Sequence, residues 1–174
     1  MPDPTFKIDS TTVLSKSGTT VTIGNVTLSN STIVYPSNAI IQTKINQGTS
    51  RVFVSSSSTP VDVLNASITT GSQSSKVLIS FSCRTYTPSN STETAIMFGT
   101  TAGNTGDIEL FYTGWDTSGA NAGRPMCQTL WDANQSTTYT VYVTVKSSGT
   151  NTVYINPNGA TDGTYVLTLQ EIAD

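Results

Sequence analysis

The stretch Lys76-Val-Leu-Ile-Ser-Phe-Ser-Cys-Arg84 decides the fold, because every second residue from Val77 to Cys83 is apolar. Successive side chains of a β-strand point to opposite faces, so this alternation predicts a strand with one buried face and one solvated face. The same period returns between Tyr139 and Val145 and again between Tyr165 and Leu169. Three such segments predict an all-β protein whose antiparallel sheets turn one face to a core.

The rest of the chain also favours strands over helices. No window combines apolar residues at positions i, i+3, i+4 and i+7 with helix-forming residues. Clusters of Gly, Asn, Pro and Ser instead separate segments rich in Val, Ile, Thr and Tyr, at intervals of roughly 8 to 12 residues. Eight or nine strands in one domain are typical of a jelly roll or a related β-sandwich. After residue 50 we predict nine strands, over 51–54, 61–69, 76–86, 94–99, 108–112, 125–131, 138–147, 152–156 and 164–172.

The first 50 residues differ from the rest, because their apolar segments are short and closely spaced. These segments lie at 13–14, 21–23, 26–28, 32–35 and 39–41, before the polar stretch Gln47-Gly48-Thr49-Ser50. Segments this short do not build a separate globular core. We therefore predict that residues 1–50 form a β-rich stem that buries its apolar side against the same segment of neighbouring chains. An ordinary hairpin pair packed on the head, residues 51–174, is the alternative.

The charge of the chain is low and unclustered. Charged residues make up 11% of the sequence, and 8 basic residues against 11 acidic ones give a net charge of −3. Nucleic acids and anionic membranes bind clustered cations, so neither is predicted as a partner. No apolar run approaches the roughly 20 residues that span a bilayer. The first residues lack the apolar core of a secretory signal, which predicts that the chain begins in the cytoplasm where it is made. Disulfides are rare in that compartment, so we favour buried free thiols at Cys83 and Cys127 over one disulfide bridge.

Residues with catalytic chemistry are few. The chain has no histidine, so the commonest general base and the commonest zinc ligand are missing, and no Gly-x-Ser-x-Gly motif supplies a nucleophile. We predict that the protein is not an enzyme and that it needs no cofactor or metal. A glycosidase-like carboxylate pair among Asp107, Glu109, Asp116, Asp132 and Asp162 is less favoured than acidic residues that cap turns. A calcium site on Asp107, Asp116 or Asp132 is also less favoured.

Aromatic residues beside the long segment 113–124 offer a candidate ligand site. An exposed tryptophan surrounded by hydrogen-bonding side chains is the arrangement that binds sugars. The alternative for Tyr112 and for Trp131 is a place in the core or in a subunit interface, which leaves Trp115 as the exposed platform. The predicted ligand-binding residues are Tyr112, Trp115, Asp116, Asn121 and Arg124.

The last strand carries a family resemblance. The stretch Gly163-Thr-Tyr-Val-Leu-Thr-Leu-Gln-Glu-Ile172 resembles the closing strand of bacteriophage tail-fibre and head-fibre tip domains, which often end in a Gly-x-aromatic-x-apolar strand finishing with Glu-Ile. The segments from Tyr139 to Lys146 and from Val153 to Asn156 are similar to the paired strands of such tips, so the similarity covers roughly residues 51–174. The resemblance implies a homotrimer with N-terminal attachment to other virion proteins and a C-terminal jelly-roll head, able to bind a host glycan or protein. It carries over no catalytic residue.

Two hypotheses for the function follow. The first is a virion fibre or spike, in which the stem anchors and trimerises the protein and the loops 100–107 and 113–124 contact the host. A short stem fits a capsid-decorating spike as well as a tail fibre. The second is a stand-alone carbohydrate-binding module, in which Trp115 stacks on a sugar. The first predicts a stable trimer in solution and the second predicts a monomer.

Overall fold

The structure is a computed structural model in which the chain divides into two compact units, Met1–Val34 and Tyr35–Asp174. The residues that it describes are 5–8, 11–17, 20–23, 35–55, 59–71, 76–88, 94–103, 105–113, 121–147 and 152–173. The first unit holds a three-stranded antiparallel sheet in the order β1-β2-β3. Its strands are β1 (Thr5–Ile8), β2 (Thr11–Ser17) and β3 (Thr20–Ile23).

The boundary between the units differs from the predicted one. The sequence suggested a division at residues 47–50, whereas the contacts divide the chain between Val34 and Tyr35. The difference arises because β4 (Ile40–Gly48) pairs along its whole length with the last strand, β15 (Tyr165–Ile172). A segment that is weakly apolar by itself thus becomes the edge strand of the head, so the head begins before residue 40.

The second unit, which we call the head, contains three four-stranded antiparallel sheets. The base sheet has the order β12-β7-β15-β4, the tip sheet β11-β8-β14-β5 and the facing sheet β10-β9-β13-β6. The strands not yet located are β5 (Val52–Val54), β6 (Val61–Thr69), β7 (Lys76–Ser82), β8 (Thr85–Thr87), β9 (Thr94–Gly99), β10 (Glu109–Thr113), β11 (Asn121–Gly123), β12 (Met126–Asp132), β13 (Thr138–Ser147) and β14 (Val153–Ile155). A short 3-10 helix, η1 (Gly159–Asp162), connects β14 to β15.

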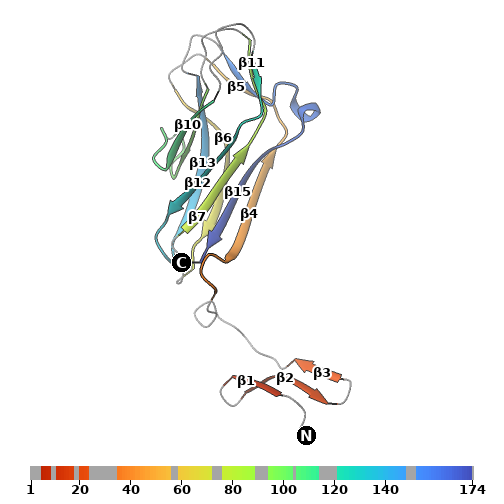
Figure 1. Ribbon diagram of the computed structural model, residues 1–174. Helices are drawn as coiled ribbons and strands as arrows, with labels where there is room; N and C mark the ends of the chain where they lie inside the picture. Colours follow the sequence, from red (N-terminus) through yellow and green to blue (C-terminus); the bar gives the residue numbers. More distant parts are fainter. Residues whose placement is uncertain are drawn as a thin grey trace. The chain divides into compact units, whose positions relative to one another are not determined.

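The base sheet and the tip sheet share their chain segments. Met126 lies opposite Ser82 in the base sheet and Gly123 lies opposite Thr85 in the tip sheet, so the ladder between the two segments passes from one sheet to the other without a register slip. The pairs β7–β8 and β11–β12 therefore act as two long strands. In Figure 1 they run from the end of the head that carries the chain terminus to the opposite end, which we call the tip.

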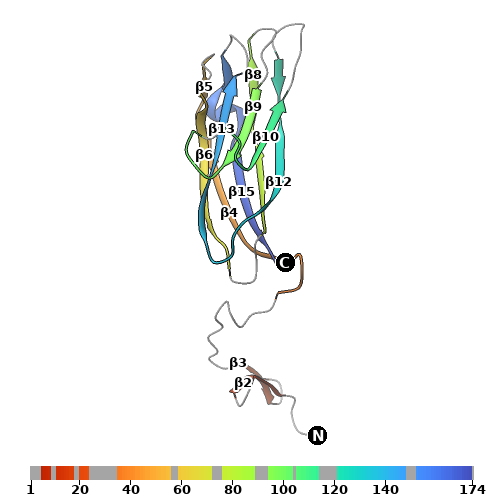
Figure 2. The same ribbon diagram turned by 90° about the vertical axis from the view of Figure 1, so that its left-hand side faces the viewer.

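The connectivity is that of a jelly roll. When β4–β5, β7–β8, β11–β12 and β14–β15 are each counted as one strand, the head has eight strands in two layers. One layer then has the order 6-3-8-1 and the other has the order 5-4-7-2, and Figure 2 shows the strands β6, β13, β9 and β10 of the second layer side by side. The head is thus the antiparallel, jelly-roll-like β-sandwich that the sequence predicted, and the described residues contain no helix able to cross a membrane.

The core lies between the two layers and follows the predicted alternation. Val77, Ile79 and Phe81 of β7 are 0–1% exposed, while the residues between them lie on the outer face. The central strands β13 and β15 alternate in the same way. Trp131 packs against this core, and its ring meets that of Tyr139 edge-on at 4.7 Å between centroids, as the core alternative for this tryptophan required.

A buried carboxylate ties the chain together at the base of the head. Glu171 is 1% exposed and accepts hydrogen bonds from the backbone N–H of Gly71 and from Nε2 of Gln42, each at 2.5 Å. Burying a charge without partners is costly, so these two donors account for its tolerance in β15. The N–H of Asn38 donates to the carbonyl of Ala173 at 2.9 Å, so the chain enters and leaves the head at the same end.

The two cysteines are buried free thiols, and the sequence favoured this state over a disulfide bridge. Cys127 lies opposite Phe81, whereas Cys83 follows two residues later, so the cysteines are diagonal neighbours on adjacent strands. Diagonal neighbours are separated by about 7–8 Å, which exceeds the usual Cα separation across a disulfide. Burial raises the pKa of Cys83 to about 12, with a further contribution from the nearby Cys127, and burial raises the pKa of Cys127 to about 11.

We expect both thiols to resist iodoacetamide in the folded protein at pH 8 and to react fully in denaturant, which mass spectrometry of the alkylated chain would measure. The thiolate is the nucleophile, and burial disfavours it. Unfolding lets both thiols ionise near the ordinary value of 9.0. The free energy of unfolding should therefore fall as the pH rises from about 9 towards about 12. Rapid native alkylation of either cysteine would contradict this placement.

Candidate functional site

The predicted ligand-binding residues do not form one site. Tyr112 is 60% exposed, but it lies on β10 of the facing sheet, opposite Ala95. Asn121 lies in β11 of the tip sheet, where it pairs with Thr87. Arg124 follows β11 directly and is exposed. The remaining two, Trp115 and Asp116, lie outside the described residues. The candidate site lies on the tip sheet, which Arg124 borders.

An aromatic row crosses the outer face of the tip sheet. In the strand register, Tyr154 lies opposite Phe53 on one side and opposite Tyr86 on the other, and Ala122 follows Tyr86 on the edge strand. The rings of Tyr154 and Phe53 meet edge-on at 5.3 Å between centroids, and those of Tyr86 and Tyr154 lie tilted at 6.0 Å. Phe53 is 57% exposed. Three rings in contact form an apolar platform with one open end above Ala122.

Their neighbours along the strands explain why these rings face outward. Val54, Val153 and Ile155 are fully buried, and so are the two threonines that flank Tyr86. A residue between two inward-facing neighbours must point to the other side of the pleat. The row is thus the direct result of three short strands that each carry an aromatic residue at the centre.

An arginine row lies beside the aromatic row. Arg51 precedes Phe53 by two residues and Arg84 precedes Tyr86 by two, while Arg124 follows Ala122 by two on the antiparallel edge strand. All three arginines therefore lie on the same side of the aromatic row, about 7 Å from it along the strand direction. Because the register is continuous, Arg124 lies opposite Arg84. The guanidinium carbon of Arg51 lies 5.5 Å from the centroid of the Phe53 ring, a cation–π contact.

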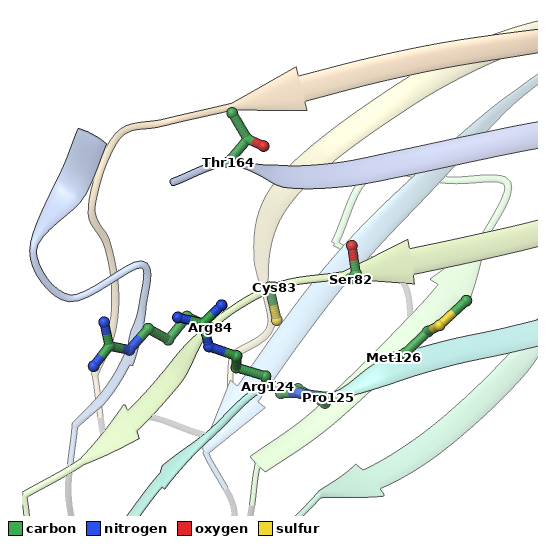
Figure 3. A pocket seen from close by; sticks show the side chains of 7 residues that line it. All are labelled: Ser82, Cys83, Arg84, Arg124, Pro125, Met126 and Thr164. Atoms are coloured by element: carbon green, nitrogen blue, oxygen red, sulfur yellow. The ribbon is translucent and has the colours of Figure 1, made fainter. Parts of the chain in front are cut away.

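Shallow hollows connect the two rows. One hollow of about 160 Å³ is lined by Arg84 and Arg124 together with Ser82, Cys83, Pro125, Met126 and Thr164. Figure 3 shows the two arginine side chains next to each other in this hollow. The hydroxyl groups of Ser82 and Thr164 lie on another part of the wall of the hollow. A second hollow of about 230 Å³ joins Arg84 and Tyr86 to Ala122, Pro157 and Asn158. None of the described residues that line these hollows is acidic.

A rigid turn holds the tip surface in place. Asn156 is 1% exposed, has a φ of 54°, and donates from Nδ2 to the carbonyls of Thr49, Gly159 and Gly163 at 2.9, 2.8 and 3.1 Å. Its backbone N–H donates to the carbonyl of Arg84 at 2.8 Å. Gly159 also has a positive φ, of 60°, and this turn places Pro157 and Asn158 in the wall of the second hollow beside the arginines.

Two of the acidic residues that the sequence singled out, Asp107 and Glu109, accept hydrogen bonds from backbone N–H groups, and so does Asp62. Asp107 accepts hydrogen bonds from the N–H and the hydroxyl of Thr100 at 3.1 and 3.0 Å, and Asp62 accepts one from the N–H of Gly103 at 2.8 Å. Glu109 accepts from the N–H of the next residue, Leu110, at 3.2 Å. The contacts of Asp107 are the turn-capping role that the sequence favoured for it. Across the described ranges, no three acidic or cysteine side chains gather in a way that could hold a metal ion.

A second exposed surface lies on the outer side of the base sheet, and we call it the neutral face. Four of its large apolar residues are more than half exposed, at 56% for Ile40, 65% for Ile45, 70% for Met126 and 55% for Leu130. The outward positions between them carry Thr, Ser, Gln, Val, Leu and Ile. The only charged pair on these outward positions of the base sheet, Lys76 opposite Asp132, lies in the row at one end of the strands.

Sequence reasoning missed the aromatic row and two of the three arginines. The alternation on β7 continues through Ser80 and Ser82 to Arg84, so a signal for an outward-facing Arg84 was present in the sequence. The pairing of Tyr86 with Tyr154, and of Tyr154 with Phe53, joins segments distant in sequence. Nothing in the local pattern shows that these rings share one row.

Comparison with known proteins adds no relative. No protein-family model matches the chain, and no curated protein matches it significantly. The surfaces described above are therefore the basis for assigning a function.

Proposed function

We propose that this chain is a virion structural protein, a trimeric fibre or spike whose jelly-roll head recognises the host with its tip. The proposal is supported by the positions of the base and of the candidate binding surface at opposite ends of the head. Asn38 and Ala173 are hydrogen-bonded at the base, and the aromatic and arginine rows lie at the opposite end of the long strands. A head attached at one end leaves its tip open to a partner, as a particle-mounted recognition domain requires.

The neutral face supports self-association of the head. Monomeric proteins rarely expose contiguous apolar surface that is larger than a few hundred Å². A chain with a net charge of −3 repels its own copies, and this repulsion is weakest where a surface carries almost no charge. Copies of the same chain are therefore the occupant that suits this face. In the proposal the N-terminal unit adds contacts to other virion proteins.

We expect sedimentation equilibrium at micromolar concentration to give the mass of three chains. Replacing Leu130 by aspartate should raise the dissociation constant of the trimer at least about tenfold, because the interface would bury an unpaired carboxylate. Leu130 is 55% exposed and lies opposite Leu78 on β12, an edge strand of the neutral face. Because the side chain of Leu130 lies outside the core, replacing it leaves the core of each head intact.

Tyr112→Asp is the matched control for this experiment. Tyr112 is 60% exposed, close to the exposure of Leu130, but it lies on the facing sheet. This variant should remain a trimer. A monomeric wild-type chain would contradict the fibre proposal, and a Leu130→Asp variant as tightly associated as the control would rule out the neutral face as the interface.

The aromatic row favours one alternative, a stand-alone carbohydrate-binding module. Rings on a rigid sheet bind sugars by stacking, whatever the oligomeric state. Such a module would be a monomer that retains glycans through Phe53, Tyr86 and Tyr154. The mass in solution distinguishes it from the fibre.

A further inference from the structure

The arginine row concentrates positive charge at one place on an acidic chain. Arg51, Arg84 and Arg124 are three of the 8 basic residues of the sequence, whose net charge is −3. Two of them lie directly opposite each other on adjacent strands, a position in which like charges destabilise a sheet. An anion that contacts both guanidinium groups would form charge-assisted hydrogen bonds with each of them.

The aromatic row sets a second requirement for the ligand. Tyr86 lies next to the arginine pair, and Arg84 and Tyr86 line the same hollow. A ligand that fills this hollow must offer a flat apolar face to the ring and an anionic group to the guanidinium groups, about 7 Å apart along the strands. Pyranose rings present such faces of C–H groups, and a carboxylate carried on the ring lies close to that face.

The planar geometry of the arginine side chain favours a carboxylate. Each guanidinium group donates two parallel N–H bonds to the two oxygens of a carboxylate. Hydroxyl groups of Ser82 and Thr164 line the adjoining hollow and can exchange hydrogen bonds with sugar hydroxyls. Ala122, opposite Tyr86 on the edge strand, is exposed and lines the same hollow as Tyr86, so the next sugar along a chain can lie against it.

We propose that the tip of the head binds an acidic saccharide, a sugar chain with carboxylates on its rings, with Arg84 and Arg124 on a carboxylate and Tyr86 against a ring. This inference rests on the proposed recognition role of the head, and it names the class of ligand. It requires no trimer, because all the residues involved come from one head.

The test is isothermal titration of the full chain with an oligogalacturonate and with its methyl-esterified, uncharged form. We expect the charged oligosaccharide to bind at least about tenfold more tightly, since charge-assisted hydrogen bonds are the strong ones. Arg124→Gln should weaken binding by a similar factor, because Arg124 is exposed and its loss leaves the core intact. Tyr86→Leu should also weaken binding, since it removes the aromatic face while keeping apolar volume.

Lys44→Gln is the matched control, because Lys44 is an exposed cation on β4, away from the tip sheet. It should leave the affinity unchanged. Equal losses from Lys44→Gln and Arg124→Gln would show unspecific attraction and overturn the proposal, as would equal binding of the charged and the esterified sugars or no binding of either. Tighter binding of a sulfated oligosaccharide would overturn the carboxylate assignment. A monomeric chain that binds the oligogalacturonate would overturn the fibre alone.

Discussion

Replacing Phe81 by alanine should lower the free energy of unfolding by about 3–5 kcal/mol, a large share of the total for a domain of this size. Phe81 is 1% exposed and lies between Cys127 and Leu167 in the centre of the base sheet. The truncation removes the packing contacts of a buried ring and leaves a cavity that neighbouring strands cannot close. Equilibrium denaturation in guanidinium chloride, followed by tryptophan fluorescence, measures the loss.

Phe53→Ala provides the control with the same change of side chain. Phe53 is 57% exposed, so its truncation should cost only about 1 kcal/mol, through its contacts with Tyr154 and Arg51. Similar losses from the two truncations would contradict the assignment of Phe81 to the core. The same Phe53 variant also tests how far the platform depends on its outermost ring.

Replacing Gly48 by valine should destabilise the head by about 1–3 kcal/mol, because the ring of Tyr165 occupies the space that a Cβ at this position needs. Gly48 and Tyr165 lie opposite each other at one end of the β4–β15 ladder. Tyr165 is 4% exposed, and burial raises the pKa of its hydroxyl. A side chain at position 48 would therefore push a buried ring out of its site, which the denaturation midpoint would report.

A double-mutant cycle with Tyr165→Leu isolates this contact. In the Tyr165→Leu background, Gly48→Val should cost at least about 1 kcal/mol less than in the wild type, because the smaller side chain frees the space beside residue 48. Gln47→Val controls for the choice of valine, since Gln47 is an exposed neighbour on the same strand. Additive effects of the two substitutions would show that the ring and the glycine do not compete for space.

Most of the fold was predictable because the two-residue period is local information. The alternation in Val77, Ile79 and Phe81 predicted the buried face of β7, and the same period predicted the buried faces of β13 and β15. The segment 40–48 was not assigned to the head, because its outward positions mix isoleucine with Thr43 and Gln47 and its inward positions between 42 and 46 are polar. Its place is determined by the partner strand β15, which lies more than a hundred residues later in the chain.

The tip surface was less predictable than the fold. Arg124 was selected as a ligand residue from its neighbours in sequence, and the structure places it opposite Arg84 instead of beside Tyr112. Which strand lies next to which is a tertiary property, so the aromatic row had no local signature. The buried carboxylate of Glu171 is a similar case, because its donors come from Gln42 and Gly71.

The unbroken ladder between β7–β8 and β11–β12 has a mechanical consequence. When a ligand held at the tip is pulled away from the anchored base, the load runs parallel to these strands and perpendicular to their interstrand hydrogen bonds. Bonds loaded in this direction share the force and must break together, whereas a hairpin pulled apart from its end loses them one after another. In the proposed fibre, a head built in this way resists tension along its length while its tip holds a ligand.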